Sequence, residues 1–428
     1  MEVFLLLCLL FSATVTAVYL NDPFTNLNFT PPIKSPNELL RHERSLADGE
    51  IPDYVLDNCP LIHLYSEERY FPGDIASFLP HFRLATGNNE TLIDKPLKIS
   101  DLKSKYKVSG EEYSSDSLYL DTTERFEEDP SWLLGTHPEY GTGLTRDASS
   151  ILIAVDKGNG WVDAYWFYFY PFNLGPFIMG YGPWGNHIGD WEHSLVRFYK
   201  GQPQYIWMSA HGGGASYTYN CIEKKDRWKV TPDGKFDKTQ VIKRPLLFSA
   251  RGTHANYASV GQHAHDVPFF FSALSDFTDR GPLWDPSLRF YGFTYDGHAF
   301  HEKKGQNIGT SWLYFLGHWG NKKLKASDPR QKWCPVQWRY IDGPRGPAAK
   351  NLVRTALCER SKWWNFWHGC PVRRMIKRGQ GLDAERNDLV GDNCGIALYR
   401  IRPKWLRSLL RLITWRGAFC FFMDYFTG

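Results

Sequence analysis

The sequence lacks the short motifs that mark several enzyme classes. It has no phosphate-binding P-loop, no dinucleotide fingerprint opening a helix and no Gly-x-Ser-x-Gly nucleophile elbow. None of its eight cysteines forms a Cys-x-x-Cys pair, which argues against a zinc knuckle or a thioredoxin-type centre. The formal net charge of +4 on 428 residues is too small to predict nucleic-acid binding. The remaining classes are a binding protein and an enzyme whose site carries none of these motifs.

Long hydrophobic runs are also scarce. Residues 3–11 form an apolar block that is too short to span a bilayer, and the small residues Val15 and Ala17 after it suit signal-peptidase cleavage. We therefore predict a signal peptide over residues 1–17, with an uncleaved anchor as the alternative because Glu2 replaces the usual basic residue. The predicted location is the secretory pathway, with the vacuole or endomembrane lumen, or the cell exterior, as destination.

Entry into the secretory pathway gives meaning to two other features. Asn28 and Asn89 begin N-glycosylation acceptor triplets, although Pro31 disfavours the first. An oxidising compartment also permits disulfides, and we expect them among four cysteines, with the pairing open. These are Cys334, Cys358, Cys370 and Cys394.

Aromatic residues are abundant, at 16% of the chain, and they favour β-strands. Residues 151–155 and 161–170 flank a turn, as do residues 194–199 and 204–210, and residues 245–250 add another strand. Successive hairpins without intervening helices predict a mainly β protein with an antiparallel β-sandwich core. We place this domain at residues 51–345, after an irregular N-terminal arm at 18–50.

A C-terminal extension over residues 346–428 is predicted to be helical and basic. Residues 348–367 suit a helix, and residues 398–416 interleave Trp and Leu with Arg and Lys at helical spacing. An amphipathic basic helix either packs on the body of the protein or lies on an anionic membrane surface.

The most informative stretch is residues 185–193, which holds two carboxylates and two imidazoles. In an extended strand Asp190 and Glu192 leave the same face, so their charges converge unless a cation or donor neutralises them. His187 comes from the preceding turn, and oxygens with one imidazole suit a divalent cation. The alternative is a solvated strand face with an ordinary turn histidine. His193 should point to the opposite face as a buried, hydrogen-bonded residue.

Several distinctive segments lie in order along the chain: LIHLYSEE at residues 61–68, YWFYFYPFN at 165–173, GNHIGDWEH at 185–193, SARGTHANY at 249–257, YFLGHWG at 314–320 and DGPRGP at 342–347. Together they resemble the vacuolar protein sorting-associated protein 62 family of fungi and plants. The resemblance implies a role in vacuolar protein sorting and no established catalytic chemistry.

The chain is more distantly similar to the necrosis- and ethylene-inducing-peptide-like proteins, secreted β-sandwich toxins with a Gly-His-Arg-His-Asp-Trp-Glu signature. His187, Asp190 and Glu192 keep the His-x-x-Asp-x-Glu spacing with which that family surrounds a divalent cation for sphingolipid headgroup recognition. Asn173 replaces the family's Asp on the preceding strand, and Gly189 its second His. The resemblance implies a cation site, with calcium or magnesium favoured over zinc.

Three further residues are candidates for ligand contact. His211 lies in a segment that also looks like the toxin family, His254 lies in a sorting-family segment, and Trp191 offers an aromatic face. His263 and His265 form an alternating pair that can bind zinc, but a loop with structural histidines is the favoured interpretation.

We therefore predict a binding protein whose cation pocket holds a polar lipid headgroup or a glycan, while aromatic side chains stack on sugar faces. One alternative is a metal-dependent hydrolase that uses the same pocket with His211 or His254, for which tight zinc binding would be the sign. The others are a membrane-active toxin and a scaffold with a vestigial pocket.

Overall fold

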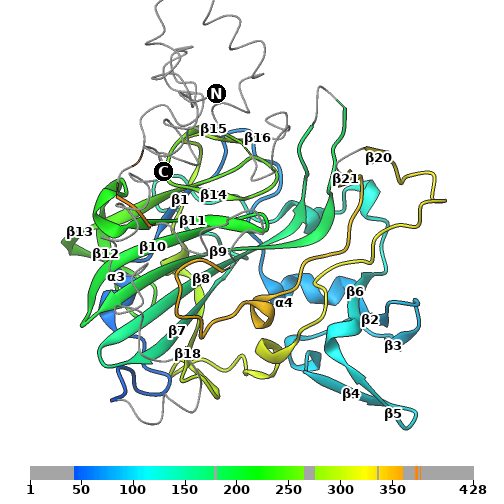
Figure 1. Ribbon diagram of the computed structural model, residues 1–428, viewed down its shortest axis with the longest axis horizontal. Helices are drawn as coiled ribbons and strands as arrows, with labels where there is room; N and C mark the ends of the chain where they lie inside the picture. The colour runs from blue at the N-terminus through cyan, green and yellow to red at the C-terminus, as the bar shows by residue number, and fades with distance from the viewer. Residues whose placement is uncertain are drawn as a thin grey trace, which may run out of the picture.

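A computed structural model describes residues 43–177, 181–264, 275–334, 337–359, 372–374 and 376. These residues form a mainly β structure, as the sequence predicted, whose largest element is an eight-stranded sheet (Figure 1). Its strand order is β19-β18-β7-β8-β9-β10-β11-β22. The bounds are β7 Ser150–Gly158, β8 Trp161–Asn173, β9 His187–Tyr199, β10 Gln202–Ala210, β11 Gly213–Thr218, β18 Phe290–Tyr295, β19 Phe300–Glu302 and β22 Val372–Arg373.

Both predicted hairpins are present in this sheet. β7 pairs antiparallel with β8, and β9 pairs antiparallel with β10. The prediction of a purely antiparallel arrangement is wrong at the edges, because β18 pairs parallel with β7 and β22 pairs parallel with β11. Parallel neighbours need long crossover connections. No local turn motif marks such connections in the sequence, so hairpin signals could not predict these pairings.

A second sheet has the order β12-β13-β1-β17, with β14 paired to β13. The predicted strand at residues 245–250 is the end of β13, whose first half is polar and partly exposed and therefore gave no hydrophobic signal. The bounds are β1 Leu61–His63, β12 Lys224–Val230, β13 Phe236–Ser249, β14 Asn256–Tyr257 and β17 Leu283–Trp284.

Short elements complete the described structure. The small sheets contain β2 Phe82–Thr86, β3 Thr91–Ile93, β4 Lys105–Val108, β5 Glu111–Ser114, β6 Leu118–Thr122, β15 Gly261–Ala264, β16 Ser275–Thr278, β20 Trp333–Cys334 and β21 Gln337–Trp338. The α-helices are α3 Asp53–Asp57 and α4 Ile75–Phe78. The 3-10 helices are η2 Leu79–His81, η3 Ile99–Asp101, η4 Ser115–Ser117, η5 Phe126–Glu128, η6 Ser131–Leu134, η7 Tyr219–Cys221, η8 Pro286–Leu288, η9 Ser311–Tyr314 and η10 Pro347–Ala349.

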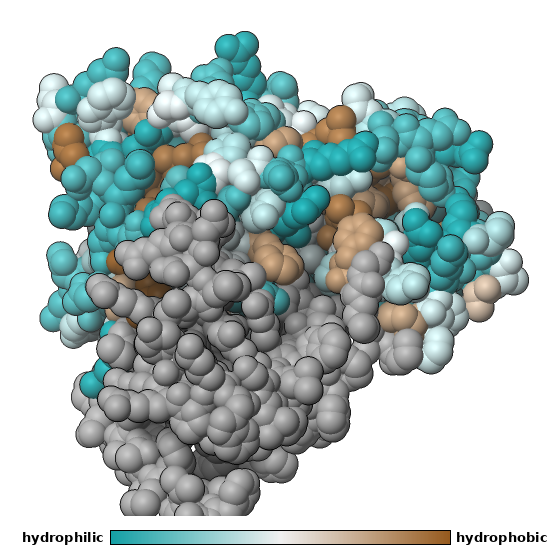
Figure 2. Space-filling view, turned by 90° about the horizontal axis from the view of Figure 1, so that it is seen from above, coloured by the Kyte–Doolittle hydropathy of each residue, from teal (hydrophilic) through white to brown (hydrophobic). Residues whose placement is uncertain are grey.

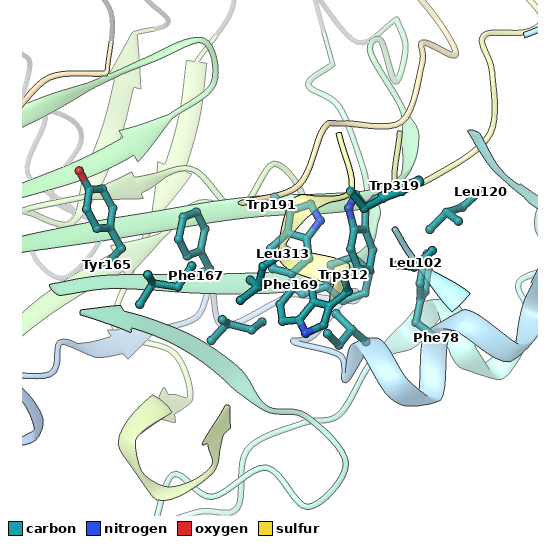
Figure 3. Close-up of a cluster of buried hydrophobic side chains, with 14 of the residues drawn as sticks. Phe78, Leu102, Leu120, Tyr165, Phe167, Phe169, Trp191, Trp312, Leu313 and Trp319 are labelled. Carbon is teal, nitrogen blue, oxygen red and sulfur yellow. The ribbon is translucent and has the colours of Figure 1, made fainter. Parts of the chain in front are cut away.

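The central sheet is buried on both faces. One face packs Tyr165, Phe167 and Phe169 against Phe78, Leu120, Trp312 and Trp319 (Figure 3). The other face packs Leu152, Trp166 and Tyr168 against residues of the second sheet, among them Ile62, Leu247 and Trp284. Coverage of both faces explains why β7 and β8 are near-continuous hydrophobic runs rather than alternating ones. The narrower description as a β-sandwich stays a prediction.

Residues 350–359 were predicted to be helical, and this is wrong. They form turns and bends across the face of the central sheet. Their carbonyl groups bind buried cations instead of helical N–H groups: Lys157 Nζ lies 2.9 Å from the oxygens of Leu352 and Arg354, and Arg197 Nη1 lies 2.7 Å from that of Thr355. These tertiary contacts override the local helix propensity.

Several other predictions fall outside the described residues: the signal peptide at 1–17, most of the arm at 18–50, the glycosylation acceptor Asn28 and the basic helix at 398–416. Cys334 is free, contrary to its expected pairing, and Cys358 is disulfide-bonded. In the part of the chain that is described, no helix is both long and apolar enough to cross a membrane.

Candidate functional site

A pocket of about 610 Å³ lies at the end of the central sheet. All four predicted cation ligands line it, namely Asn173, His187, Asp190 and Glu192. Two of the three predicted ligand-contact residues, Trp191 and His211, line it as well. The third, His254, lies behind Asp190 instead of in the pocket wall.

The pocket exists because β10 separates from β9 early. The two strands pair only as far as Met208 and Ser194. Beyond that point the side chain of Ser209 takes over, and its Oγ accepts the His193 N–H at 2.7 Å. The first half of β9 is therefore left without β10 as a neighbour, and Asp190 and Glu192 border the opening.

Gly189 shapes the strand at the pocket. Its φ is +67°, and a Cβ atom there would overlap the carbonyl oxygen of Trp319. Only glycine adopts this backbone conformation without strain, and no side chain has room. The second histidine of the toxin signature would not fit at this position, which gives a physical reason for that departure.

Asp190 is neutralised from behind by His254. His254 Nδ1 lies 2.9 Å from Asp190 Oδ2, and Nε2 lies 2.9 Å from the carbonyl oxygen of Tyr70, which can only accept, so Nε2 carries a proton. Burial alone would lower the pKa of His254, but the hydrogen bond to Asp190 and the charge of Glu68 outweigh it and raise that pKa. The imidazolium form is thus favoured beside the Asp190 carboxylate.

Glu192 is held differently. Its Oε2 accepts a hydrogen bond from the Ser209 hydroxyl. Burial, together with the negative charge of Asp190, raises the pKa of Glu192 to about 8. Near neutral pH the protonated form of Glu192 is consequently favoured, unlike that of an exposed glutamate.

The two remaining predicted ligands each commit one atom to the backbone. His187 Nδ1 lies 2.6 Å from the carbonyl oxygen of Gly189, and Asn173 Nδ2 donates to that of Gly185 at 3.1 Å. Burial lowers the pKa of His187, so the neutral ring carries its proton on Nδ1 and a lone pair on Nε2. A carbonyl that fixes the tautomer in this way is typical of a metal-binding histidine.

The four residues nevertheless do not form a preassembled metal site. The candidate ligand atoms of His187, Asp190 and Glu192 do not all lie within 4.8 Å of one another. Among the described residues that criterion is met only by a partly exposed group, Asp48, Asp296 and His301. The four residues line one pocket, while Asp190 and Glu192 each bind an interior partner; their role as cation ligands stays a prediction.

Asp276 was not predicted and holds His211 in position. It is buried and accepts hydrogen bonds from His211 Nε2 at 2.6 Å, Tyr257 Oη at 2.7 Å and Thr253 Oγ1 at 2.7 Å. The pairing of β15 with β16 brings it there from 65 residues away. No local pattern signals such a contact. The backbone indicates a functional site here. His211 and His254 both have a positive φ, at 55° and 56°, and strained residues of this kind are concentrated at functional sites.

Another wall comes from beyond the predicted sandwich. Ala349, Lys350 and Glu359 line the pocket, as does Arg345. Lys350 and Glu359 form an ion pair at 3.2 Å. These residues reach the pocket because residues 350–359 run across the sheet instead of forming the predicted helix.

The other histidines have structural roles. His193 points to the opposite face, as predicted, where its ring packs 4.9 Å from Phe167 and 4.8 Å from Trp207. Its two ring nitrogens form no hydrogen bond within the described residues, contrary to the prediction, although Nε2 lies 3.9 Å from Glu359 Oε2. Burial lowers the pKa of His193 well below the usual value. His263 is buried beside Thr278, and its neighbour His265 lies outside the described residues.

Comparison with known proteins identifies the family to which the chain belongs. No protein-family model matches the chain. Vacuolar protein sorting-associated protein 62 of Saccharomyces cerevisiae is 60% identical over 412 residues, which cover 94% of this chain and 88% of that protein. The putative vacuolar protein sorting-associated protein TDA6 of the same yeast is 55% identical over 411 residues, covering 93% and 88%. The chain belongs to the vacuolar protein sorting-associated protein 62 family, as its motifs predicted.

Two solved structures are distantly similar. Necrosis and Ethylene inducing Protein 2, from the causal agent of cocoa's witches' broom disease, is 13% identical with a TM-score of 0.22, covering 51% of this chain and 72% of that one. The protein NLPPya, solved in complex with mannosamine, is 12% identical with a TM-score of 0.20, covering 50% and 72%.

Proposed function

We propose that the protein acts in vacuolar protein sorting as a binding protein, and that its pocket recognises a polar lipid headgroup or a glycan with the help of a divalent cation. The sorting role is supported by the 60% identity to vacuolar protein sorting-associated protein 62. The predicted signal peptide favours action in the vacuolar or endomembrane lumen, or outside the cell.

One observation carries the pocket part of the proposal. Asp190 and Glu192 stand side by side at a pocket of about 610 Å³, and each uses one carboxylate oxygen on an interior partner. The second oxygen of each, together with His187 Nε2 and the Asn173 amide oxygen, makes a donor set of oxygens and one imidazole. Calcium, magnesium and manganese suit such a set.

The same geometry predicts weak binding by the cation alone. His254 already supplies positive charge to Asp190, and the raised pKa of Glu192 means that a proton competes with the cation. A ligand with adjacent hydroxyl groups would complete the coordination, so cation and ligand should strengthen each other's binding by the same factor.

Calorimetry on metal-stripped protein tests the proposal. Calcium, magnesium and manganese are expected to bind weakly alone and more tightly with a bound saccharide or headgroup. Asp190→Asn should abolish this heat, whereas the matched control Asp296→Asn, in the surface group with Asp48 and His301, should leave it unchanged. No binding of these cations with or without sugars would refute the pocket model, and tight zinc binding would favour the hydrolase instead.

A further inference from the structure

One side of the pocket mouth is made by two segments that are distant in sequence. They are the connection between β8 and β9 and the hairpin of β20 and β21. The backbone N–H groups of Gly185 and Asn186 donate to the carbonyl oxygens of Trp338 and Arg339, each at 2.8 Å. Trp184 and Gln337, one from each segment, both line the pocket. We call residues 174–177, 181–186, 321–334 and 337–345 the rim.

The rim exposes large aromatic side chains to solvent. Phe177 is 55% exposed, Tyr181 75% and Trp333 60%. Trp333 pairs across the hairpin with Trp338, whose ring carries the Lys323 ammonium group at 4.1 Å. Side chains of this size are normally buried, and three exposed ones on the segments that border a pocket indicate an interaction surface.

The rim is also basic. Residues 321–345 contain seven Lys and Arg against two Asp, a net charge of +5, which exceeds the +4 of the whole sequence. Of the seven, only Arg330 forms an ion pair within the described residues. Lys325 and Lys332 are exposed. The positive charge is therefore available to an anionic partner.

We propose that the rim docks the protein on an anionic lipid membrane with the pocket mouth facing the headgroups. Tryptophan and tyrosine prefer the membrane–water interface, and lysines beside them are attracted to anionic lipids. The β8–β9 end and the β20–β21 hairpin lie at the upper right of Figure 1. Figure 2 shows the molecule from above, with hydrophobic residues scattered among hydrophilic ones over the coloured part of that face. Nucleic acid fits less well, because proteins that bind single strands stack the bases on rings inside a basic groove, whereas Phe177, Tyr181 and Trp333 are not among the residues that line the pocket.

The inference goes beyond the proposed function and does not require a cation in the pocket. It is tested by flotation of the full chain, in the presence of a chelator, with vesicles of phosphatidylcholine alone or with added phosphatidylserine. Binding is expected only to the anionic vesicles. Each lysine near the surface contributes about a fivefold gain, so Lys325→Gln/Lys332→Gln should weaken binding about 25-fold.

The edge formed by β12 and β13 offers a matched control, since it lies at the opposite end of the molecule (Figure 1). Lys225→Gln/Lys243→Gln removes the same charge from exposed positions there and should change binding less than about twofold, because salt screens distant charges. Trp333→Ser should weaken binding, whereas Trp228→Ser, which removes a 41% exposed ring from β12, should not.

Three results would overturn the inference. Equal loss in both lysine pairs would mean a general charge effect. Unchanged binding in the rim variants would locate the membrane contact elsewhere on the chain. Failure to float with anionic vesicles, combined with rim-dependent binding of a single-stranded oligonucleotide, would assign the rim to nucleic acid.

Discussion

The strands β8 and β9 carry two buried clusters of ionisable groups, one of opposite charges that pair with each other and one of two neighbouring acids. Near one end, Asp163 and Arg197 are direct cross-strand partners joined by two hydrogen bonds of 2.7 Å, with Lys157 at 3.5 Å. Near the other end, Asp190 and Glu192 are two neighbouring acidic groups that border a pocket. We call them the closed cluster and the open cluster.

The two clusters differ more in how their charged groups are paired than in how deeply they are buried. The closed cluster is fully buried, and its cations also bind carbonyl oxygens of residues 350–359. The open cluster relies on one histidine and one hydroxyl group, and part of each carboxylate remains directed to the pocket. Buried charges that satisfy one another hold a structure together, whereas buried like charges beside an opening indicate a binding site.

The largest difference should appear on removal of one acid from each cluster. Asp163→Asn leaves the Arg197 guanidinium buried without its counter-charge and should lower the free energy of unfolding by about 3–5 kcal/mol. The half-exposed pair of Arg83 with Asp121 provides a control, since Asp121→Asn should cost less than about 1 kcal/mol. Urea denaturation measures both. A loss for Asp163→Asn no larger than the control would mean that the closed cluster is not stabilising.

A second prediction concerns the backbone of the open cluster. Gly189→Ala should lower the free energy of unfolding by more than the ~1–2 kcal/mol that a left-handed backbone alone costs. The added Cβ atom would also collide with the Trp319 carbonyl oxygen. Gly141→Ala is matched, with a φ of +81° and no atom within 4 Å of the added Cβ. Thermal or urea unfolding should separate the variants. Equal losses would show that the strand adjusts freely at Gly189.

What the sequence could predict depended on how local each signal is. The hairpins of β7–β8 and β9–β10 followed from alternating turn and strand patterns, and His187, Asp190 and Glu192 were found through their spacing within six residues. Their shared pocket follows from strand geometry. The partners that tune them could not be predicted, because His254 and Asp276 arrive through pairings between distant strands.

The failure at residues 350–359 has the same origin. Helix propensity is a local property, but the buried ammonium of Lys157 and guanidinium of Arg197 need acceptors, and the carbonyl groups of this segment supply them. Burial of unpaired charge is more costly than the loss of one short helix. Sequence patterns therefore located the open cluster, while the closed cluster, which fixes one wall of the pocket, was missed.

The smallest predicted effect is a pH dependence with opposite signs in the two clusters. The pKa of Glu192 is raised by burial and by Asp190 from 4.5 to about 8, so its contribution to stability is complete below the unfolded value and is lost as the pH rises towards about 8. Burial alone would raise the pKa of Asp163, but Arg197 and Lys157 outweigh it and lower that pKa below 3.8. Its contribution is therefore lost only at more acidic pH.

Urea unfolding at a series of pH values compares Glu192→Gln with the wild-type protein. The variant lacks the titrating group, so it should lose less stability than the wild type between pH ~5 and ~8, by about 1 kcal/mol or more. Asp121→Asn, which removes the half-exposed partner of Arg83, should follow the wild-type curve. Parallel curves for Glu192→Gln and wild type would mean that Glu192 titrates normally, and the contrast between an open and a closed cluster would then lose its electrostatic basis.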